Sequence, residues 1–226
     1  MLRAVIFDFD GVITDSEVLH FRAFNQVLAR YGAQITAKDY YTDYLGLSDL
    51  DAFKLLAEKN RLAPDAPPVE TLLQQKKQAF EELAKSEGRI IEGVREFLEM
   101  LRQNDIVMAI CSGSLLVEIE MVLEDAQLRS FFKVVVSAEQ VKKGKPSPEP
   151  FLLTLQNLNA KCRQPIAAGD CVVIEDSHWG LKAANDAGMH TIAITNSYDA
   201  DQLKLAEKIV ENLSELSIDD LQQLCE

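Results

Sequence analysis

Short apolar runs rich in β-branched residues alternate with helical patterns over most of the chain. A strand that is covered on both faces loses polar alternation and becomes a nearly continuous apolar run, as these segments do. Between them, apolar residues recur at helical spacing, for example at Val94, Phe97, Leu98 and Leu101 and across residues 150–159. This alternation predicts parallel βαβ units, and therefore a doubly wound α/β sheet with its site at the carboxyl ends of the strands. The predicted strands are residues 3–9, 106–111, 132–136, 171–175 and 191–195.

Residues 16–86 break this rhythm, because they contain helical patterns and no convincing strand. After a first amphipathic helix, further helices are predicted at residues 49–60 and 69–85. We therefore predict a small all-helical domain at 16–86, inserted after the first strand into an α/β core domain made of 1–15 and 87–226. The alternative is that these helices simply cover one face of the sheet.

The acidic charge balance argues against two classes of partner. The 226 residues include 23 Lys and Arg against 36 Asp and Glu, which gives a formal net charge of −13. Nucleic acids and anionic membrane surfaces repel such a chain, so neither is expected to bind it. No apolar run approaches the ~20 residues needed to span a bilayer. With 47% hydrophobic residues, the chain can still bury a sizeable core.

The cysteines and the first residues point to a reducing compartment. Cys111, Cys162, Cys171 and Cys225 show no CxxC spacing, so neither a disulfide framework nor a thiolate zinc site is indicated. Asp8 interrupts the apolar N-terminal stretch before a secretory signal could be completed. We expect a cytoplasmic protein that is a monomer or a small homo-oligomer.

The first candidate catalytic residues are Asp8 and Asp10 at the end of the first predicted strand. They flank Phe9 and precede Gly11. At a strand end the chain is already turning, so both carboxylates can converge on one pocket. Bringing two carboxylates together is costly unless a cation or a proton separates them. By itself such a pair is common, and a solvated pair at a turn is an adequate explanation.

Three further loops present complementary groups at or near strand ends. The segment from Ser112 through Gly113 to Ser114 could be a helix N-cap, and the segment around Lys145 could be a solvated basic loop. Glu175 and Asp176 could cap a following helix. Together, however, they supply carboxylates for a hard divalent ion, a hydroxyl and backbone N–H groups for phosphate oxygens, and one ammonium. The combination predicts a phosphate site.

Four segments of the chain resemble the four signature motifs of the haloacid dehalogenase-like superfamily and occur in the same order. They are Asp8-Phe9-Asp10-Gly11-Val12, Ser112, Lys145 and Glu175-Asp176. The helical insert is similar to the cap of the branch that contains β-phosphoglucomutase and many sugar-phosphate phosphatases. The resemblance implies a Rossmann-like core with a helical cap, Mg²⁺ as cofactor, and a small phosphorylated metabolite as substrate.

The resemblance also implies a role for each motif residue. Asp8 would attack phosphorus and become an aspartyl-phosphate, while Asp10 would act as general acid and then as general base. Lys145 would neutralise charge on Asp8 and on the phosphoryl group. The implied phosphate ligands are Ser112, Gly113 and Lys145, and the implied Mg²⁺ ligands are Asp8, Asp10 through its carbonyl, Glu175 and Asp176. His20 is expected either to face the substrate from the cap or to be a satisfied structural histidine.

Charge counting explains why such a site needs both cations. Asp8, Glu175 and Asp176 carry three negative charges, and a phosphate monoester adds about two more, against two from the metal and one from Lys145. A carboxylate at ~4 Å from a phosphate oxygen feels repulsion on the order of 4 kcal/mol per charge pair at an effective dielectric of ~20. Asp10 favours phosphoryl transfer over dehalogenation, because a halide leaving group needs no acid.

Two alternatives stay open beside the expected Mg²⁺-dependent sugar-phosphate phosphatase. Mutases of this branch hold a second phosphate with an arginine in a Gly-x-Ser-Arg segment, whereas the corresponding residues here end in Ser48-Asp49. A carboxylate there would repel a dianion, which favours a phosphatase over a β-phosphoglucomutase-type enzyme. A phospho-receiver or a non-catalytic metabolite-binding protein is the alternative of another class. Receivers, however, need only one domain of ~120 residues and carry their aspartate on a later strand.

Overall fold

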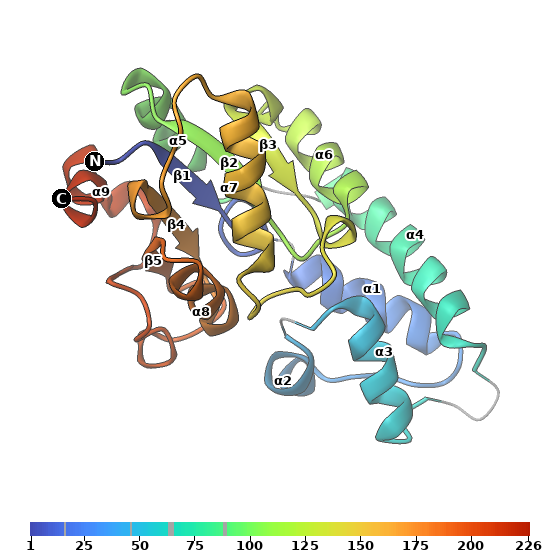
Figure 1. Cartoon of the computed structure of the whole chain (residues 1–226). Helices are drawn as coiled ribbons and strands as arrows, with labels where there is room; N and C mark the ends of the chain where they lie inside the picture. The colour runs from blue at the N-terminus through green and yellow to red at the C-terminus, as the bar shows by residue number, and fades with distance from the viewer. Residues whose placement is uncertain (16, 46, 63–65, 88–89) are drawn as a thin grey trace. The chain divides into compact units, whose positions relative to one another are not determined.

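A computed structural model describes residues 1–15, 17–45, 47–62, 66–87 and 90–226 of the chain (Figure 1). The fold divides into two compact units. We call Met1–Thr14 together with Ile90–Glu226 the sheet unit, and Asp15–Arg89 the helical unit. The division falls close to the predicted boundaries of 1–15 with 87–226 and of 16–86.

The sheet unit is built on six parallel strands, which confirms the predicted α/β class. Their order is β3-β2-β1-β4-β5-β6, so the chain moves outward from β1 in one direction and then returns to continue in the other. This reversal beside β1 is the kind of switch point where α/β sheets form their sites. The strands are β1 Ala4–Phe7, β2 Val107–Cys111, β3 Phe132–Val136, β4 Cys171–Glu175, β5 His190–Ile194 and β6 Lys208–Val210.

Two strands differ from the sequence prediction by more than one residue at an end. The strand expected at 3–9 ends at Phe7, because the backbone turns at Phe9, whose carbonyl accepts from the amides of Ile13 and Thr14 at 2.9 and 3.1 Å. The sequence pattern does not predict β6, which has only three residues and is half-buried over two of them. A segment this short carries no readable apolar run.

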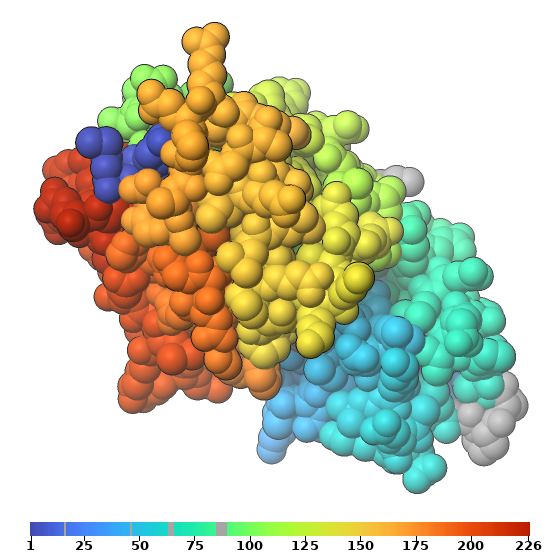
Figure 2. Space-filling model, in the orientation of Figure 1, coloured from blue at the N-terminus to red at the C-terminus, as the bar shows by residue number. Residues whose placement is uncertain are grey.

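Both faces of the sheet are covered, which explains the continuous apolar runs. On β1, Val5 and Phe7 belong to one hydrophobic cluster, whereas Ala4 and Ile6 belong to the other. The first cluster includes residues of α5 (Val94–Gln103), α6 (Leu116–Asp125) and α9 (Ile218–Leu224). The second includes residues of α7 (Glu149–Lys161) and α8 (His178–Asp186), whose side chains cover this face of the sheet in Figure 2.

Single helical turns complete the sheet unit. They are η2 Arg129–Phe131, η3 Ala138–Gln140, η4 Ala168–Asp170, η5 Ala200–Gln202 and η6 Leu213–Glu215. Among the described residues, no helix of either unit combines the length and apolar character that crossing a bilayer requires.

The helical unit contains no strand in its described residues. Its elements are α1 Glu17–Ala29, α2 Ala37–Asp39, the π-helix η1 Tyr40–Tyr44, α3 Asp49–Glu58 and α4 Val69–Glu87. Helix α4 packs against both α1 and α3, and the buried side chains of α1 include Phe24 and Leu28. The helices at 49–60 and 69–85 are therefore confirmed to within two residues at each end.

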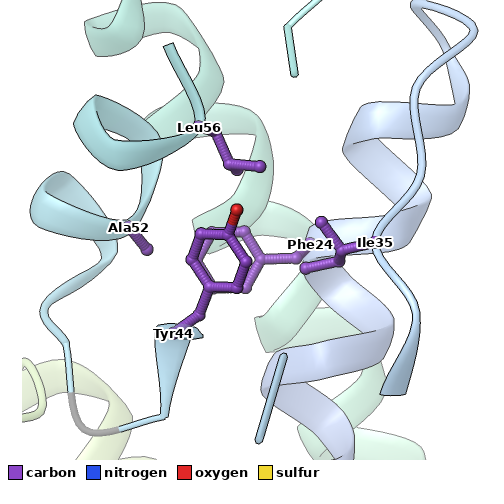
Figure 3. A pocket seen from close by; sticks show the side chains of 5 residues that line it. All are labelled: Phe24, Ile35, Tyr44, Ala52 and Leu56. Carbon is purple, nitrogen blue, oxygen red and sulfur yellow. The ribbon is translucent and has the colours of Figure 1, made fainter. Parts of the chain in front are cut away.

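The interior of the helical unit is closely packed around Tyr44 (Figure 3). The ring of Tyr44 lies between Ala52 and Leu56 of α3 and the side chains of Phe24 and Ile35. No room for a water molecule remains among these five side chains. This place is therefore core rather than a ligand site.

One matched pair of substitutions tests the two-faced packing. Leu98 of α5 is fully buried, whereas Leu152 of α7 is 47% exposed. We expect Leu98→Ala to lower the free energy of unfolding by about 2–5 kcal/mol, because it leaves a cavity against the sheet. Leu152→Ala should change it by about 0.5 kcal/mol or less. Denaturant unfolding measures both, and equal effects would contradict the assignment of the covered faces.

Candidate active site

The register of the three central strands brings three strand-end residues to the same sheet edge. Phe7 of β1 pairs with Ile110 of β2 on one side and with Ile174 of β4 on the other. The next residue on each strand is therefore level with the others. These residues are Asp8, Cys111 and Glu175, at the carboxyl ends of their strands.

Lys145 joins these three strand ends. Its ammonium donates to Asp8 Oδ1 at 2.7 Å, to Glu175 Oε1 at 2.6 Å and to the Cys111 carbonyl at 3.0 Å. The Lys145 side chain is only 12% exposed, so the contacts take place largely away from water. All three donor positions of the ammonium are thus used by groups from three different strands.

Burial and the neighbouring charges have opposite effects on the pKa of Lys145. Burial alone would lower the pKa of Lys145, but the attraction of Asp8 and Glu175 outweighs it and holds that pKa well above its ordinary value. Burial raises the pKa of Asp8 to about 7, and the negative charges of Glu175 and Asp10 add to this while Lys145 opposes it. The Asp8 carboxylate therefore needs positive charge close to it in order to be ionised at neutral pH.

Glu175 is fully buried, and both of its oxygens have protein donors. While Oε1 accepts from Lys145, Oε2 accepts from the amides of Asp176 and Ser177 at 3.0 and 3.1 Å and from the Ser177 hydroxyl at 2.9 Å. Ser177 is also the N-cap of α8, accepting from the Gly180 amide at 3.1 Å. The cap of this helix is thus Ser177, and Glu175 instead orients Lys145.

Asp8, Glu175 and Asp176 form a group that could hold a metal ion, since each offers an oxygen and these oxygens all lie within 4.8 Å of one another. An all-oxygen donor set of this kind fits a hard cation such as Mg²⁺. The fit is best for Asp8 and Asp176, because Glu175 could serve only by sharing an oxygen that already accepts a hydrogen bond.

The loop after β2 contacts the second aspartate of the first motif. The hydroxyl of Ser114 donates to Asp10 Oδ2, and the amide of Ser114 donates to the hydroxyl of buried Ser112 at 2.9 Å. Gly113 between them is exposed. The N-cap of α6 is Leu115, so neither serine caps that helix. The contact of Ser114 with Asp10 joins residues 104 positions apart, and the sequence pattern does not reveal it.

Only glycine fits at two positions, because a carboxylate lies directly against the backbone there. A Cβ at Gly11, whose φ is +78°, would lie 1.7 Å from Asp176 Oδ2, and one at Gly180 would lie 1.7 Å from Glu175 Oε1. No side chain fits at either position. Gly180 leaves the space that Glu175 occupies. The four motifs do not include it, although a glycine inside a helix is itself a signal of close packing.

His20 belongs to a separate cluster within the helical unit. Burial and the nearby Lys76 charge hold the pKa of His20 well below its usual value, so its neutral ring accepts at Nδ1 from Lys76 Nζ at 2.6 Å. Fully buried Lys76 also donates to Asp49 Oδ2 at 2.7 Å, and the His20 ring stacks on Phe80. His20 is thus satisfied within its own unit, and its contact with a substrate stays a prediction.

Comparison with known proteins agrees with the four motifs. Residues 5–194 match the sequence profile of a family described as haloacid dehalogenase-like hydrolase. The chain belongs to this family. The match spans every motif at the sheet edge and includes the helical unit, so the predicted family and fold are confirmed.

Among relatives of this haloacid dehalogenase-like hydrolase are two phosphatases. The chain is 34% identical over 192 residues to a phosphorylated carbohydrates phosphatase from Thermotoga maritima, which covers 84% of each protein. It is 30% identical over 224 residues to hexitol phosphatase B from Escherichia coli, covering 97% of this chain and 96% of that protein.

Solved structures show the same fold over nearly the whole chain. CbbY from Rhodobacter sphaeroides, in complex with phosphate, has a TM-score of 0.88 at 23% identity and covers 98% of this chain and 100% of that one. A β-phosphoglucomutase from Clostridium difficile has a TM-score of 0.83 at 24% identity, covering 100% of this chain and 97% of that one. The fold is thus shared by these two proteins over nearly the whole chain.

Gly180 provides a test of how Glu175 is held. We expect Gly180→Ala to lower the free energy of unfolding by about 1–3 kcal/mol, because the added Cβ displaces the buried carboxylate. The matched control is Gly169→Ala, where a Cβ would meet nothing within 4 Å and the effect should stay near 0.5 kcal/mol. Denaturant unfolding measures both variants. A neutral or stabilising Gly180→Ala would contradict the packing described.

The raised pKa of Asp8 predicts a measurable titration. In metal-free protein, carboxyl NMR should show Asp8 titrating near pH 7 rather than near its ordinary 3.8. Lys145→Met should raise the midpoint further, because Lys145 opposes the shift. The folded state binds this proton more tightly than the unfolded chain, so the Asp8 contribution to stability is full below 3.8 and is lost as pH rises through about 7. A midpoint close to 4 would contradict the account.

Proposed function

We propose that this protein is a Mg²⁺-dependent phosphatase of small phosphorylated carbohydrates that acts through an aspartyl-phosphate. The observation that carries the proposal is the buried Lys145 ammonium between Asp8 and Glu175, beside the carboxylate of Asp176. Such a cluster suits a dianionic substrate only if the negative charges around it are balanced by cations. We assign to the helical unit the role of a cap that selects the substrate.

Asp8 is the group that we assign as nucleophile. One of its oxygens attacks phosphorus, and a bond from Asp8 to phosphorus forms as the bond from phosphorus to the sugar oxygen breaks. Asp10 enters this step in its protonated form and donates that proton to the leaving oxygen. In the second half-reaction Asp10 takes a proton from water, the water oxygen attacks phosphorus, and the bond to Asp8 breaks to release phosphate.

Ser114 supports this assignment of Asp10. Its hydroxyl donates to Asp10 Oδ2, which orients the carboxyl group. Ser112, with the Gly113 amide, is assigned to phosphate oxygens, and Lys145 is assigned to the same phosphoryl group. These groups come from loops at the ends of rigid strands. They are therefore already oriented before the substrate binds, and no free energy of reorganisation is needed at each turnover.

Mg²⁺ would be held by the side chains of Asp8 and Asp176 and by the backbone carbonyl of Asp10, with Glu175 close by. When bound, it supplies positive charge that keeps Asp8 ionised and polarises a phosphate oxygen. Lys145 provides the remaining positive charge, and because Glu175 holds it from the other side, its ammonium stays directed at Asp8.

The substrate class rests on the relatives. Two of them are named as phosphatases of phosphorylated carbohydrates and of hexitols, and they align over most of this chain. A second candidate, a phosphomutase, draws support from the fold shared with β-phosphoglucomutase. Asp49 argues against a phosphomutase. Its carboxylate pairs with Lys76 at 2.7 Å and neutralises the positive charge with which the cluster of His20, Lys76 and Asp49 could attract a second phosphate.

Removal of the nucleophile tests the proposed function. We expect Asp8→Asn to lower the hydrolysis rate of an aryl phosphate by about 10³-fold or more, because an amide oxygen does not form the covalent intermediate. Phosphate release is the measurement. The control is Asp186→Asn, which makes the same change at an exposed position on α8 and should leave the rate unaltered.

The same assay tests the metal. Chelation of divalent ions should abolish phosphate release by the wild type, and added Mg²⁺ should restore it. Turnover that persists in Asp8→Asn would contradict the nucleophile, whereas turnover that survives chelation would contradict only the metal requirement.

Product analysis separates phosphatase from mutase. With β-glucose 1-phosphate and a trace of the glucose 1,6-bisphosphate, we expect free phosphate and glucose as the main products. The physical reason is the pairing of Asp49 with Lys76, which leaves no net positive charge for the distal phosphate. NMR of the reaction identifies the products, and conversion to glucose 6-phosphate without phosphate release would establish the mutase instead.

A further inference from the structure

Three consecutive residues of the loop that follows β5 contact the candidate active site or the start of α8 beside it. It comprises Asn196, Ser197 and Tyr198, and it begins where β5 ends beside β4. None of the four sequence motifs includes these residues. They lie about 20 positions after Asp176 in the chain. Asn196 and Ser197 contact the site, and Tyr198 contacts the start of α8, all within the sheet unit.

Ser197 contacts the carboxylate of Asp176 directly. Its hydroxyl donates to Asp176 Oδ2, while Asp176 itself is buried to 4% exposure. Rotation of a carboxylate about its terminal bond is otherwise broad, because this torsion has no sharp minima. The hydrogen bond from Ser197 therefore restricts the plane in which Asp176 presents its oxygens.

Gly11 also lies against the carboxylate of Asp176. A Cβ at Gly11 would lie 1.7 Å from Asp176 Oδ2 and 3.0 Å from Ser197 Oγ, so both groups occupy the space that a side chain would fill. The Asp176 carboxylate is thus enclosed between the backbone of the turn after Asp10 and the hydroxyl of Ser197.

The neighbours of Ser197 fix the loop at both ends. Asn196 Nδ2 donates to the Gly11 carbonyl at 3.2 Å, which ties the loop to the turn after β1. The Tyr198 ring meets the His178 ring edge-on, with centroids 5.0 Å apart, which ties it to the first residue of α8. The hydroxyl of Ser197 is therefore held in place by contacts on either side of it.

We propose that residues 196–198 form a clamp that positions Asp176 for Mg²⁺, with Ser197 as the positioning residue. Hydrogen-bonding partners that orient metal ligands commonly alter metal affinity about 10–100-fold when they are removed. The proposal rests on the proposed function, since it concerns the metal that this function requires. Ser197 itself touches neither the metal nor the substrate in this account.

The test measures metal binding without turnover. Mn²⁺, which takes the same oxygen ligands, is titrated into substrate-free protein, and the free ion is followed by its EPR signal. We expect Ser197→Ala to weaken Mn²⁺ binding about 10-fold or more, and Ser197→Thr, which keeps the hydroxyl, to remain near the wild type. In assays, Ser197→Ala should need correspondingly more Mg²⁺ for half-maximal rate but approach the wild-type kcat at saturation.

The control is Ser217→Ala, which removes another hydroxyl contact to a carboxylate, that of Asp220, at the exposed start of α9. It should leave Mn²⁺ binding unchanged, and its Tm gives the stability effect of losing such a contact. Mn²⁺ affinity within about twofold of the wild type in Ser197→Ala would overturn the clamp alone. A wild type that binds no Mn²⁺ would overturn the metal requirement of the proposed function, and the clamp with it.

Discussion

The structure of the site depends on one buried ammonium placed between two carboxylates. Lys145 bonds to Asp8 and Glu175 at 2.7 and 2.6 Å with little access to water. Unpaired, each of these three charges would be expensive to bury. Their mutual attraction holds Lys145 charged, while Asp8 is left with a pKa of about 7, so its ionisation depends on further positive charge. The proposed function supplies that charge, since it places Mg²⁺ beside Asp8 together with the substrate phosphate.

Several acidic side chains lie close together in this site, and the backbone around them has to leave room for their carboxylates. Glu175 lies over Gly180 of α8, and Asp176 lies over Gly11 of the first turn, at distances that exclude any Cβ. Amides and hydroxyls at the start of α8 satisfy Glu175, while Ser114 and Ser197 contact Asp10 and Asp176 from neighbouring loops. The parallel sheet makes this possible, because it aligns several strand ends at one edge.

Much of this arrangement can be predicted from the sequence, and the remainder has a physical reason for being hidden. Buried strands leave apolar runs, and Asp8, Lys145 and Glu175 stand in motifs whose charges need one another, so their meeting is predictable. Ser114, Gly180 and Ser197 act through contacts with residues that only the folded chain brings near, and serine and glycine are common in any loop or helix start. Strand β6 is too short to produce a pattern. The roles assigned to His20 and the helical unit stay predictions.

The most direct test of the account is to look for the phosphoryl group on the protein. Asp10→Asn should slow release from Asp8 more than transfer to it when the leaving group is a good one, such as an aryl oxide. Acid quench during turnover, followed by digestion and mass spectrometry, should then find the mass of one phosphoryl group on the peptide containing Asp8. Turnover that leaves Asp8 unmodified, with the phosphoryl group on another residue, would contradict the account.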